Sequence, residues 1–243
     1  MRVHSLRPPF TLEGIENGSI YSANGISPRP SNLFLEIASG GDLYIKIPSA
    51  YALRDLQAFV DAPESLGQWN IRQPIDAERF DRLDDALSVP AYTCLRRLES
   101  LPREQIYYLV LFMMQYRRLR TQTAVGIPEA RFGAIRLRRF GLFHRDTPAL
   151  FQQRIPGVTL WEMFDFEADR IRPEWVAGLT DVKPQLSALL YSPMAAHIDW
   201  NIKNFVLHAT TKQLFYIDQK PTLFVAGHGN EHNLNGIRRH FLT

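Results

Sequence analysis

The chain has 243 residues, 45% of them hydrophobic and 12% aromatic, which is enough material to bury a substantial core as one large domain or two lobes. Its single cysteine, Cys94, excludes an intrachain disulfide, and no apolar run reaches the roughly 18 residues that a membrane-spanning helix needs. The N-terminal residues lack the apolar core of a signal peptide. We therefore expect a cytoplasmic protein with no membrane partner.

The formal net charge is +3, and the excess gathers in a stretch rich in arginine. The arginines of this stretch are Arg117, Arg118, Arg120, Arg131, Arg136, Arg138 and Arg139. They lack the regular interleaving with aromatic residues that is typical of a nucleic-acid platform. We expect a solvated face or a surface for an anionic substrate, and no nucleic-acid partner.

Short apolar runs separated by Gly, Asn and Pro fill residues 10–48 and predict strands. The expected strands cover Phe10–Leu12, Ser19–Ser22, Asn32–Ile37 and Asp42–Ile47, with a hairpin turn at Ser39–Asp42. This pattern favours an antiparallel sheet. Residues 50–99 contain several prolines, and we expect short helices there, around Tyr51–Val60 and Ala77–Leu87.

Pro102 is expected to open a long helix that runs to about Arg120, because proline is favoured in the first turn. Residues Ile106–Met114 are apolar on almost every face, which predicts a largely buried helix. Two strands, Phe132–Phe143 and Ala149–Arg154, should follow and be joined near Asp146.

The last third of the chain begins with an Ile-Pro-Gly turn at 155–157 that leads into a helix. A further helix is expected over Pro173–Leu190, bent at Pro184. Two short strands, Asn204–Leu207 and Leu214–Ile217, should form a hairpin. The predicted order along the chain is therefore strands, helix, strands, helix, loop and hairpin.

Four polar residues near the C-terminus have the composition of a phosphotransfer site: His197, Asp199, Asn204 and Asp218. One carboxylate can take a proton from a hydroxyl acceptor, while an asparagine and a second carboxylate can hold Mg²⁺ on nucleotide phosphates. The alternative is that His197 and Asp199 cap the preceding helix and Asn204 lies in a turn.

The order His-x-Asp, four residues, Asn and two apolar strand residues, followed by a strand that ends in Asp218, resembles the catalytic loop and metal-binding strand of the protein-kinase-like superfamily. The aminoglycoside and small-molecule phosphotransferase branch is the most similar. The resemblance implies a bilobal α+β fold. An antiparallel-sheet N-lobe would cover 1–153, with an insertion at 50–100, and a small, mainly helical C-lobe would cover 154–243.

In this superfamily ATP and Mg²⁺ are held between the lobes. The resemblance implies that Asp199 is the catalytic base, that Asn204 and Asp218 are the metal ligands, and that His197 braces the loop backbone. It also implies that Lys46, on a strand of alternating pattern, contacts the α and β phosphates. A solvent-facing strand lysine is the alternative for Lys46.

Further residues follow from the same resemblance. Glu104 is the expected ion-pair partner of the lysine, and Gly18, in the turn Gly14–Tyr21, could offer backbone amides to phosphate oxygens. Gln153 and Ile155 lie in the expected hinge, where strand backbone groups receive the adenine. An ordinary turn at Gly18 and a plain strand-turn-helix at the hinge remain open.

The sequence therefore predicts an ATP-dependent phosphotransferase that moves the γ-phosphoryl group to a hydroxyl of a small molecule, such as a sugar or an aminoglycoside-like compound. A compact bacterial protein Ser/Thr kinase and a nucleotide-binding pseudokinase or scaffold are the other hypotheses. The segment after Asp218 departs from the family, since Gln219 and Lys220 replace Phe-Gly or Trp-Gly. Acceptor recognition would then come from residues 50–100 or from the arginine-rich stretch.

The histidines near the C-terminus and the single cysteine are two further candidates for chemistry. His228 and His232 have the spacing of zinc ligands on a helix, but the neighbouring glycines are expected to break such a helix. Cys94 has no supporting motif for a nucleophile, so we expect a buried structural cysteine.

Overall fold

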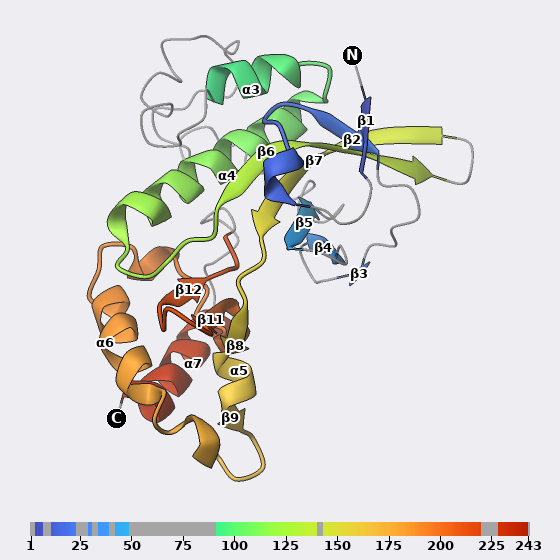
Figure 1. Ribbon diagram of the computed structural model, residues 1–243. Helices are drawn as coiled ribbons and strands as arrows, with labels where there is room; N and C mark the ends of the chain where they lie inside the picture. The colour runs from blue at the N-terminus through green and yellow to red at the C-terminus, as the bar shows by residue number, and fades with distance from the viewer. Residues whose placement is uncertain are drawn as a thin grey trace. The chain divides into compact units, whose positions relative to one another are not determined.

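The computed structural model describes residues 3–6, 11–22, 29–30, 34–38, 42–48, 91–139, 143–219 and 228–242. The chain folds into two compact units (Figure 1). The first unit comprises Met1–Met114 and Glu129–Arg154, and the second comprises Gln115–Pro128 and Ile155–Thr243. The helices expected at Tyr51–Val60 and Ala77–Leu87 lie outside the described residues. Among the described helices, none combines the length and the hydropathy that crossing a bilayer requires.

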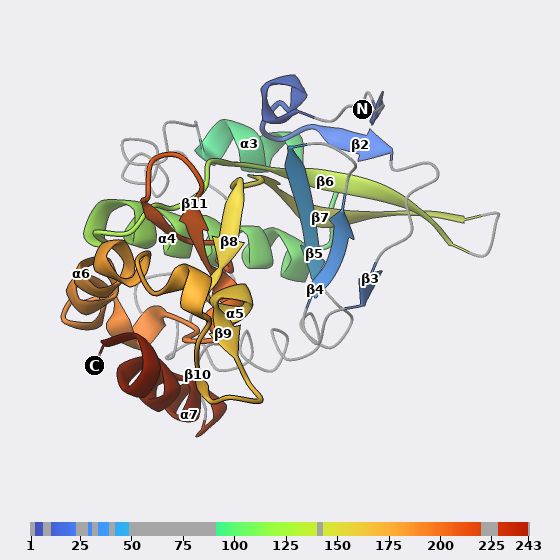
Figure 2. The same cartoon turned by 60° about the horizontal axis from the view of Figure 1, so that its bottom comes forward.

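The first unit is built on one seven-stranded sheet with the order β1-β2-β6-β7-β5-β4-β3, as far as the described residues show (Figure 2). The strands are β1 (Val3–Ser5), β2 (Ile20–Ser22), β3 (Arg29–Pro30), β4 (Phe34–Ala38), β5 (Leu43–Pro48), β6 (Ala130–Arg139) and β7 (Phe143–Gln153). The sheet is mixed, because β2 runs parallel to both β1 and β6, whereas the other pairs are antiparallel.

The prediction of a purely antiparallel sheet is wrong at this edge for a local reason. Phe10–Leu12 was expected to be a strand, but Leu12 begins the 3₁₀ helix η1 (Leu12–Gly14) instead. The chain between β1 and β2 is therefore a crossover rather than a hairpin, and a crossover is what joins two parallel strands.

The two hairpins of the sheet differ in how well the sequence predicted them. The hairpin of β4 and β5 is confirmed by the antiparallel register that pairs Ala38 with Tyr44. The turn expected near Asp146 is wrong, because Asp146 lies inside β7 and pairs with Arg136. Pro148 fits in this strand because β5 pairs with β7 only as far as Leu150, so the missing N–H breaks no bond of that ladder.

The sheet of the first unit is buried on both faces. Leu43, Ile45 and Ile47 alternate onto one face of β5, with exposed fractions of 1%, 0% and 1%. On the other face, the register places Lys46 beside Leu150, and Leu150 beside Phe132. The ring of Phe132 contacts Phe112 of the helix α4 at a centroid distance of 6.2 Å, so α4 covers the face that carries Lys46.

The long helix predicted from Pro102 is confirmed as α4 (Arg103–Gln122), and α3 (Ala91–Arg97) precedes it. Proline opens the helix, since the Pro102 carbonyl accepts the amides of Gln105 and Ile106. The helix is buried as expected. Its buried apolar residues are Ile106, Tyr108, Leu109, Val110, Phe112, Met113, Tyr116 and Leu119.

The second unit contains a three-stranded antiparallel sheet in the order β12-β11-β8. Its strands are β8 (Gly157–Thr159), β11 (Phe205–His208) and β12 (Leu214–Tyr216), which confirms the predicted hairpin to within one residue. The remaining elements are α5 (Leu160–Met163), β9 (Phe164–Asp165), β10 (Arg170–Ile171), η3 (Pro173–Trp175), α6 (Leu179–Leu190), η4 (Ala195–His197), η5 (Ile202–Asn204), α7 (His228–Ile237) and the π-helical turn η7 (Arg238–Leu242).

Two helices of this unit differ from the prediction. The helix expected over Pro173–Leu190 is divided into the 3₁₀ turn η3 and the helix α6, which contains Pro184. Residues around His228, which were expected to lie outside a helix, form α7.

The core of the second unit is aromatic at the point where the loop after η4 meets the hairpin. Trp200, Phe205 and Tyr216 are each at most 2% exposed, and their rings contact one another in series at centroid distances of 5.9 and 5.4 Å. This packing fixes the loop that carries Asp199 against β11 and β12.

Candidate functional site

The loop between η4 and β11 carries three of the predicted site residues. It begins at His197, whose carbonyl oxygen accepts a hydrogen bond from Gln115 Nε2 at 3.3 Å. Burial lowers the pKa of His197 below its usual value of 6.5, and the positive charge of Arg118 lowers it further. His197 is therefore neutral at pH 7. It lies at the start of the loop, and the role expected for it was to support the loop backbone.

Asp199 is held by its backbone and by one carboxylate oxygen. Its N–H donates to the Tyr216 hydroxyl at 3.1 Å, and its Oδ1 accepts the Asn201 N–H at 3.2 Å. The neighbours Ile198 and Trp200 are buried, whereas Asp199 itself is half-buried. The bond of its carboxylate to Asn201 thus lies within the loop that follows Asp199.

Asn204 ends the 3₁₀ turn η5, which is capped by Asn201 through the Lys203 N–H at 3.0 Å. Asn204 Nδ2 donates to the carbonyl oxygen of Asp199 at 3.2 Å. This bond fixes the orientation of the amide, and Oδ1 accepts no hydrogen bond from the described residues. A fixed amide oxygen of this kind is a ligand suited to a hard cation.

Asp218 follows β12 and is tied to the loop through its neighbour, because the Ile217 N–H donates to the Asn204 carbonyl at 2.8 Å. Burial raises the pKa of Tyr216 well above its usual value of 10, and the negative charge of Asp218 adds to this rise. The charge of Asp199 raises the same pKa, whereas the bond from the Asp199 N–H lowers it. Both carboxylates therefore lie within electrostatic reach of one buried phenol.

A metal ion is implied by the family resemblance, and the residues present fit one in part. Asn204 and Asp218 supply hard oxygen donors, and Mg²⁺ usually takes one or two carboxylates together with phosphates and water. The described residues contain no group of three or more His, Cys, Asp or Glu that could hold a metal by itself. Asn204 and Asp218 are therefore the two oxygen donors that could contribute to holding such an ion.

Asn230 is a loop contact that the sequence reasoning missed. From α7, its Oδ1 accepts the Trp200 N–H at 2.7 Å and its Nδ2 donates to the Ile198 carbonyl at 2.9 Å. The side chain thus binds the backbone on both sides of Asp199. Its only sequence signal was an asparagine in a polar segment, which is also typical of a turn.

Lys46 lies in the first unit, on β5, and its exposed fraction is 6%. The solvent-facing alternative for this lysine is therefore wrong. Its register partner on β4 is Glu36. Glu104 lies at the second residue of α4, and its side chain is outside the described part of the chain.

Gly18 has a structural role in the first unit. Its φ of 77° lies in the left-handed region, and an added Cβ would come within 2.8 Å of the Cys94 carbonyl oxygen. Its N–H donates to the Phe132 carbonyl at 2.8 Å, so this amide is already bound. We therefore leave Gly18 out of the proposed site.

The expected hinge is a strand followed by a turn and the short helix α5. The Gln153 N–H donates to the Glu129 carbonyl at 2.8 Å, so that amide is already bound as well. The backbone N–H of Ile155 makes no hydrogen bond with the described residues. Of the two predicted hinge residues, Ile155 is therefore the one whose backbone N–H could donate a hydrogen bond to a ligand.

The two remaining candidates are His228 with His232, and Cys94. His228 and His232 lie on the helix α7, so the reason given for discounting a zinc site is wrong, although the His228 side chain is outside the described residues. Cys94 is fully buried, as expected, with its Sγ donating to the Phe132 carbonyl at 3.3 Å. Burial raises the pKa of its thiol to about 12, which makes it unreactive at neutral pH.

Comparison with known proteins gives no relative on which to base a function: no family model matches the chain, and no curated protein is significantly similar to it.

Proposed function

We propose that this protein is an ATP-dependent phosphotransferase that moves the γ-phosphoryl group to a hydroxyl of a small molecule. The observation that carries this proposal is the arrangement around Tyr216. Its hydroxyl accepts the Asp199 N–H, its pKa is raised by the charges of Asp218 and Asp199, and Asn204 is bonded to both segments. Phosphoryl transfer to a hydroxyl needs one carboxylate as the base, and an amide with a second carboxylate as metal ligands.

Each residue has a separate task in this proposal. Asp199, with Oδ1 fixed by the loop, orients the acceptor hydroxyl and takes its proton. Asn204 and Asp218 would hold Mg²⁺, which neutralises charge on the phosphates when it is bound. His197 is neutral and acts on the loop backbone. Lys46 is the proposed phosphate contact, as the sequence resemblance implies.

The direct test is transfer of label from γ-labelled ATP and Mg²⁺ to panels of polyols, sugars and amino sugars, followed by mixed proteins. We expect labelling of a small hydroxyl compound. Asp199→Asn should lower kcat by a factor of about 10² to 10⁴ while nucleotide binding is retained. Asp181→Asn, a change of the same kind in the first turn of α6, is the matched control and should leave transfer unchanged.

The outcomes separate the three hypotheses. If only proteins are labelled, the chain is a protein kinase. If nucleotide binds and no acceptor is labelled, the pseudokinase or scaffold hypothesis holds. Full activity of Asp199→Asn would show that the base is assigned to the wrong residue.

A further inference from the structure

Trp161 lies on α5, beside the loop that carries the predicted metal ligand Asn204. The Nζ of Lys203 lies 3.9 Å from the centre of the Trp161 ring, within the range of a cation–π contact. The ring of Phe166 lies at a centroid distance of 4.0 Å from the same Trp161 ring. Lys203 directly precedes Asn204 in η5, so this contact reaches the candidate site through one residue.

The Trp161 ring contacts both Lys203 and Phe166, although 40% of the residue remains exposed.

The base of this contact is rigid. A capping box starts α5: Thr159 Oγ1 accepts the Glu162 N–H at 3.1 Å, and Glu162 Oε2 accepts the Thr159 N–H at 2.7 Å. Leu160 and Met163 on the same turn are fully buried. Trp161 is therefore held by a fixed turn although the residue is partly exposed.

The other end of the contact is the short turn η5. The Asn204 N–H donates to the Asn201 carbonyl at 2.8 Å, and α5 packs directly against η5. A lysine side chain that is free in solvent would leave the outer side of this turn unsupported. The contact of Lys203 with Trp161 restricts rotation of the η5 turn. Because Asn204 belongs to this turn, the contact also restricts the direction of Asn204 Oδ1.

We propose that Trp161 and Lys203 form a cation–π clamp that positions Asn204 for the metal–nucleotide complex. Trp161 and Lys203 are positioning residues, which act through η5 and do not touch the ligand. The metal part of this inference rests on the proposed function. The clamp itself is a property of the loop and can be measured without any activity.

The test measures binding of Mn²⁺ to the protein with ADP, by electron paramagnetic resonance, and the thermal midpoint of the same samples. Trp161→Ala and Lys203→Met should each raise the Mn²⁺ dissociation constant by about 3- to 10-fold, with little change in the midpoint. The double variant should be no worse than either single one, because both remove one contact. Lys203→Arg keeps the cation and should restore affinity.

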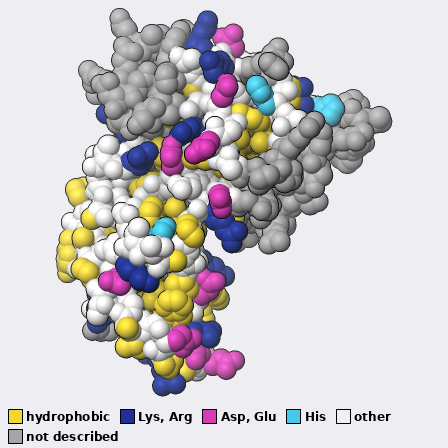
Figure 3. All heavy atoms as spheres, in the orientation of Figure 1, with side chains coloured by type: hydrophobic (Ala, Val, Ile, Leu, Met, Phe, Trp, Pro, Cys, Tyr) yellow, Lys and Arg dark blue, Asp and Glu magenta, His cyan; other side chains and the backbone are white. Residues whose placement is uncertain are grey.

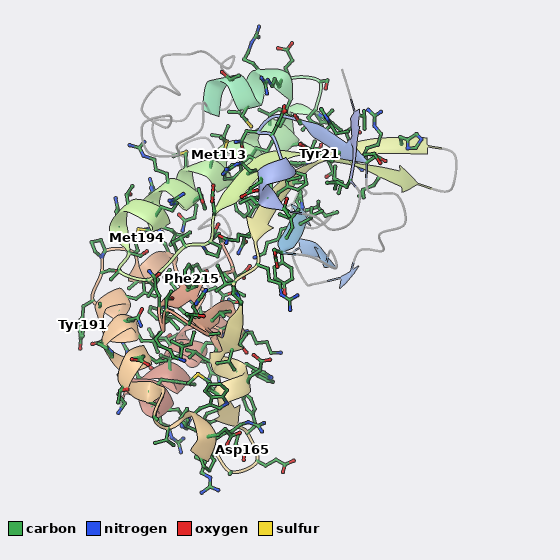
Figure 4. All side chains as sticks on the ribbon, viewed as in Figure 1. Tyr21, Met113, Asp165, Tyr191, Met194 and Phe215 are labelled. Carbon is green, nitrogen blue, oxygen red and sulfur yellow. The ribbon has the colours of Figure 1, made fainter. Side chains whose placement is uncertain are left out.

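The matched control is Tyr191→Ala, which removes an aromatic side chain from the same unit. Tyr191 is 84% exposed and points away from the ribbon, as Figure 4 shows. This variant should bind Mn²⁺ as the unchanged protein does. If Lys203→Met also binds Mn²⁺ with unchanged affinity, the clamp has no positioning role and the inference is wrong.

A failure of the proposed function would give a different result. If the unchanged protein does not bind Mn²⁺ with ADP at all, the metal assignment fails, and hydrogen exchange then decides on the clamp alone. Faster exchange of the amides of 202–206 in Trp161→Ala, and not in Tyr191→Ala, would support the clamp. Equal exchange in both variants would overturn it.

Discussion

Tyr216 joins the parts of the candidate site through a single hydroxyl group. The phenol is buried, and it accepts the Asp199 N–H at 3.1 Å. Replacement of Tyr216 by Phe removes this acceptor of the Asp199 N–H from the interior of the unit. We expect the free energy of unfolding to fall by about 1–3 kcal/mol, as measured by denaturant titration. Tyr191→Phe, on an exposed ring, should change it by less than about 0.5 kcal/mol.

The same variant tests the role of Tyr216 in the site. Because the phenol stays neutral, its loss should lower turnover through the position of Asp199 and should not move the pH profile. Stability and turnover equal to those of the unchanged protein would show that the hydrogen bond to Asp199 has no consequence.

His197 makes the stability of the protein depend on pH in a defined direction. Its pKa in the folded state lies below the unfolded value of 6.5, mainly because of burial. The unfolded chain therefore binds a proton more readily, and folding is favoured fully only above about pH 6.5. As the pH falls through the lower folded value, this contribution is lost.

We therefore expect unfolding curves of the unchanged protein and of His197→Gln to diverge with pH. The unchanged protein should lose more stability than the variant between about pH 6.5 and pH 5. Paired denaturant titrations at several pH values measure the difference. A difference that is constant over this range would mean that His197 is not the group responsible.

The residues of the site divide by how they act. Asp199, Asn204 and Asp218 could be named as candidates from the sequence because side-chain chemistry restricts which residue types can serve as base and metal ligand. Tyr216 and Asn230 could not, because each binds backbone groups that every residue possesses. A tyrosine in a strand is equally well explained by packing, and an asparagine by a turn.

Among the elements, α7 matters to the loop through one side chain. Asn230 binds the Trp200 N–H at 2.7 Å and the Ile198 carbonyl at 2.9 Å. Asn230→Ala removes both bonds, and we expect unfolding to become easier by about 1–3 kcal/mol, with faster hydrogen exchange at 198–200. Asn233→Ala on the same helix is the matched control, since the Asn233 side chain makes no hydrogen bond with the described residues. Unchanged exchange in Asn230→Ala would contradict the role of this helix.

Element prediction succeeded where one local signal dominated and failed where tertiary contacts decided. The long apolar run of α4 and the short apolar runs of β11 and β12 predicted these elements directly. Pro148 was misleading, because it is tolerated in β7 at a point where the pairing of β7 with β5 has already stopped. The glycine near His228 misled as well, since α7 forms despite the low helix propensity of its first residues.

For the whole molecule, the sequence predicted the α+β class, and the described residues form mixed and antiparallel sheets together with helices. It could not predict the parallel edge of the sheet, because the η1 turn has no distinct signal in the sequence.

On the face shown in Figure 3, acidic and basic side chains are interspersed. In the described residues, Arg136 is bound to Asp146 at 2.7 Å and Arg131 to Glu129 at 2.6 Å, so part of the arginine-rich stretch is already neutralised.

The family resemblance implies that Lys46 and Asp218 each contribute to nucleotide binding, and ligand-linked stability tests each of these roles separately. A ligand that binds only the folded protein stabilises it by about 2.7 kcal/mol at 100 times its Kd. We expect MgATP to raise the thermal midpoint by several degrees, and Lys46→Met and Asp218→Asn each to remove most of that rise.

The cation dependence distinguishes the two residues. Asp218→Asn should remove the part of the rise that needs Mg²⁺, whereas Lys46→Met should weaken the response to ATP with or without the cation, because its charge meets phosphate directly. Lys212→Met, on an exposed turn, is the control for loss of a lysine charge. If the two variants lower nucleotide affinity by amounts that simply add, with no coupling in the double variant, the two residues act on the ligand independently. If neither variant changes the midpoint shift, the chain binds its ligand elsewhere or binds no nucleotide, and the phosphotransferase proposal fails.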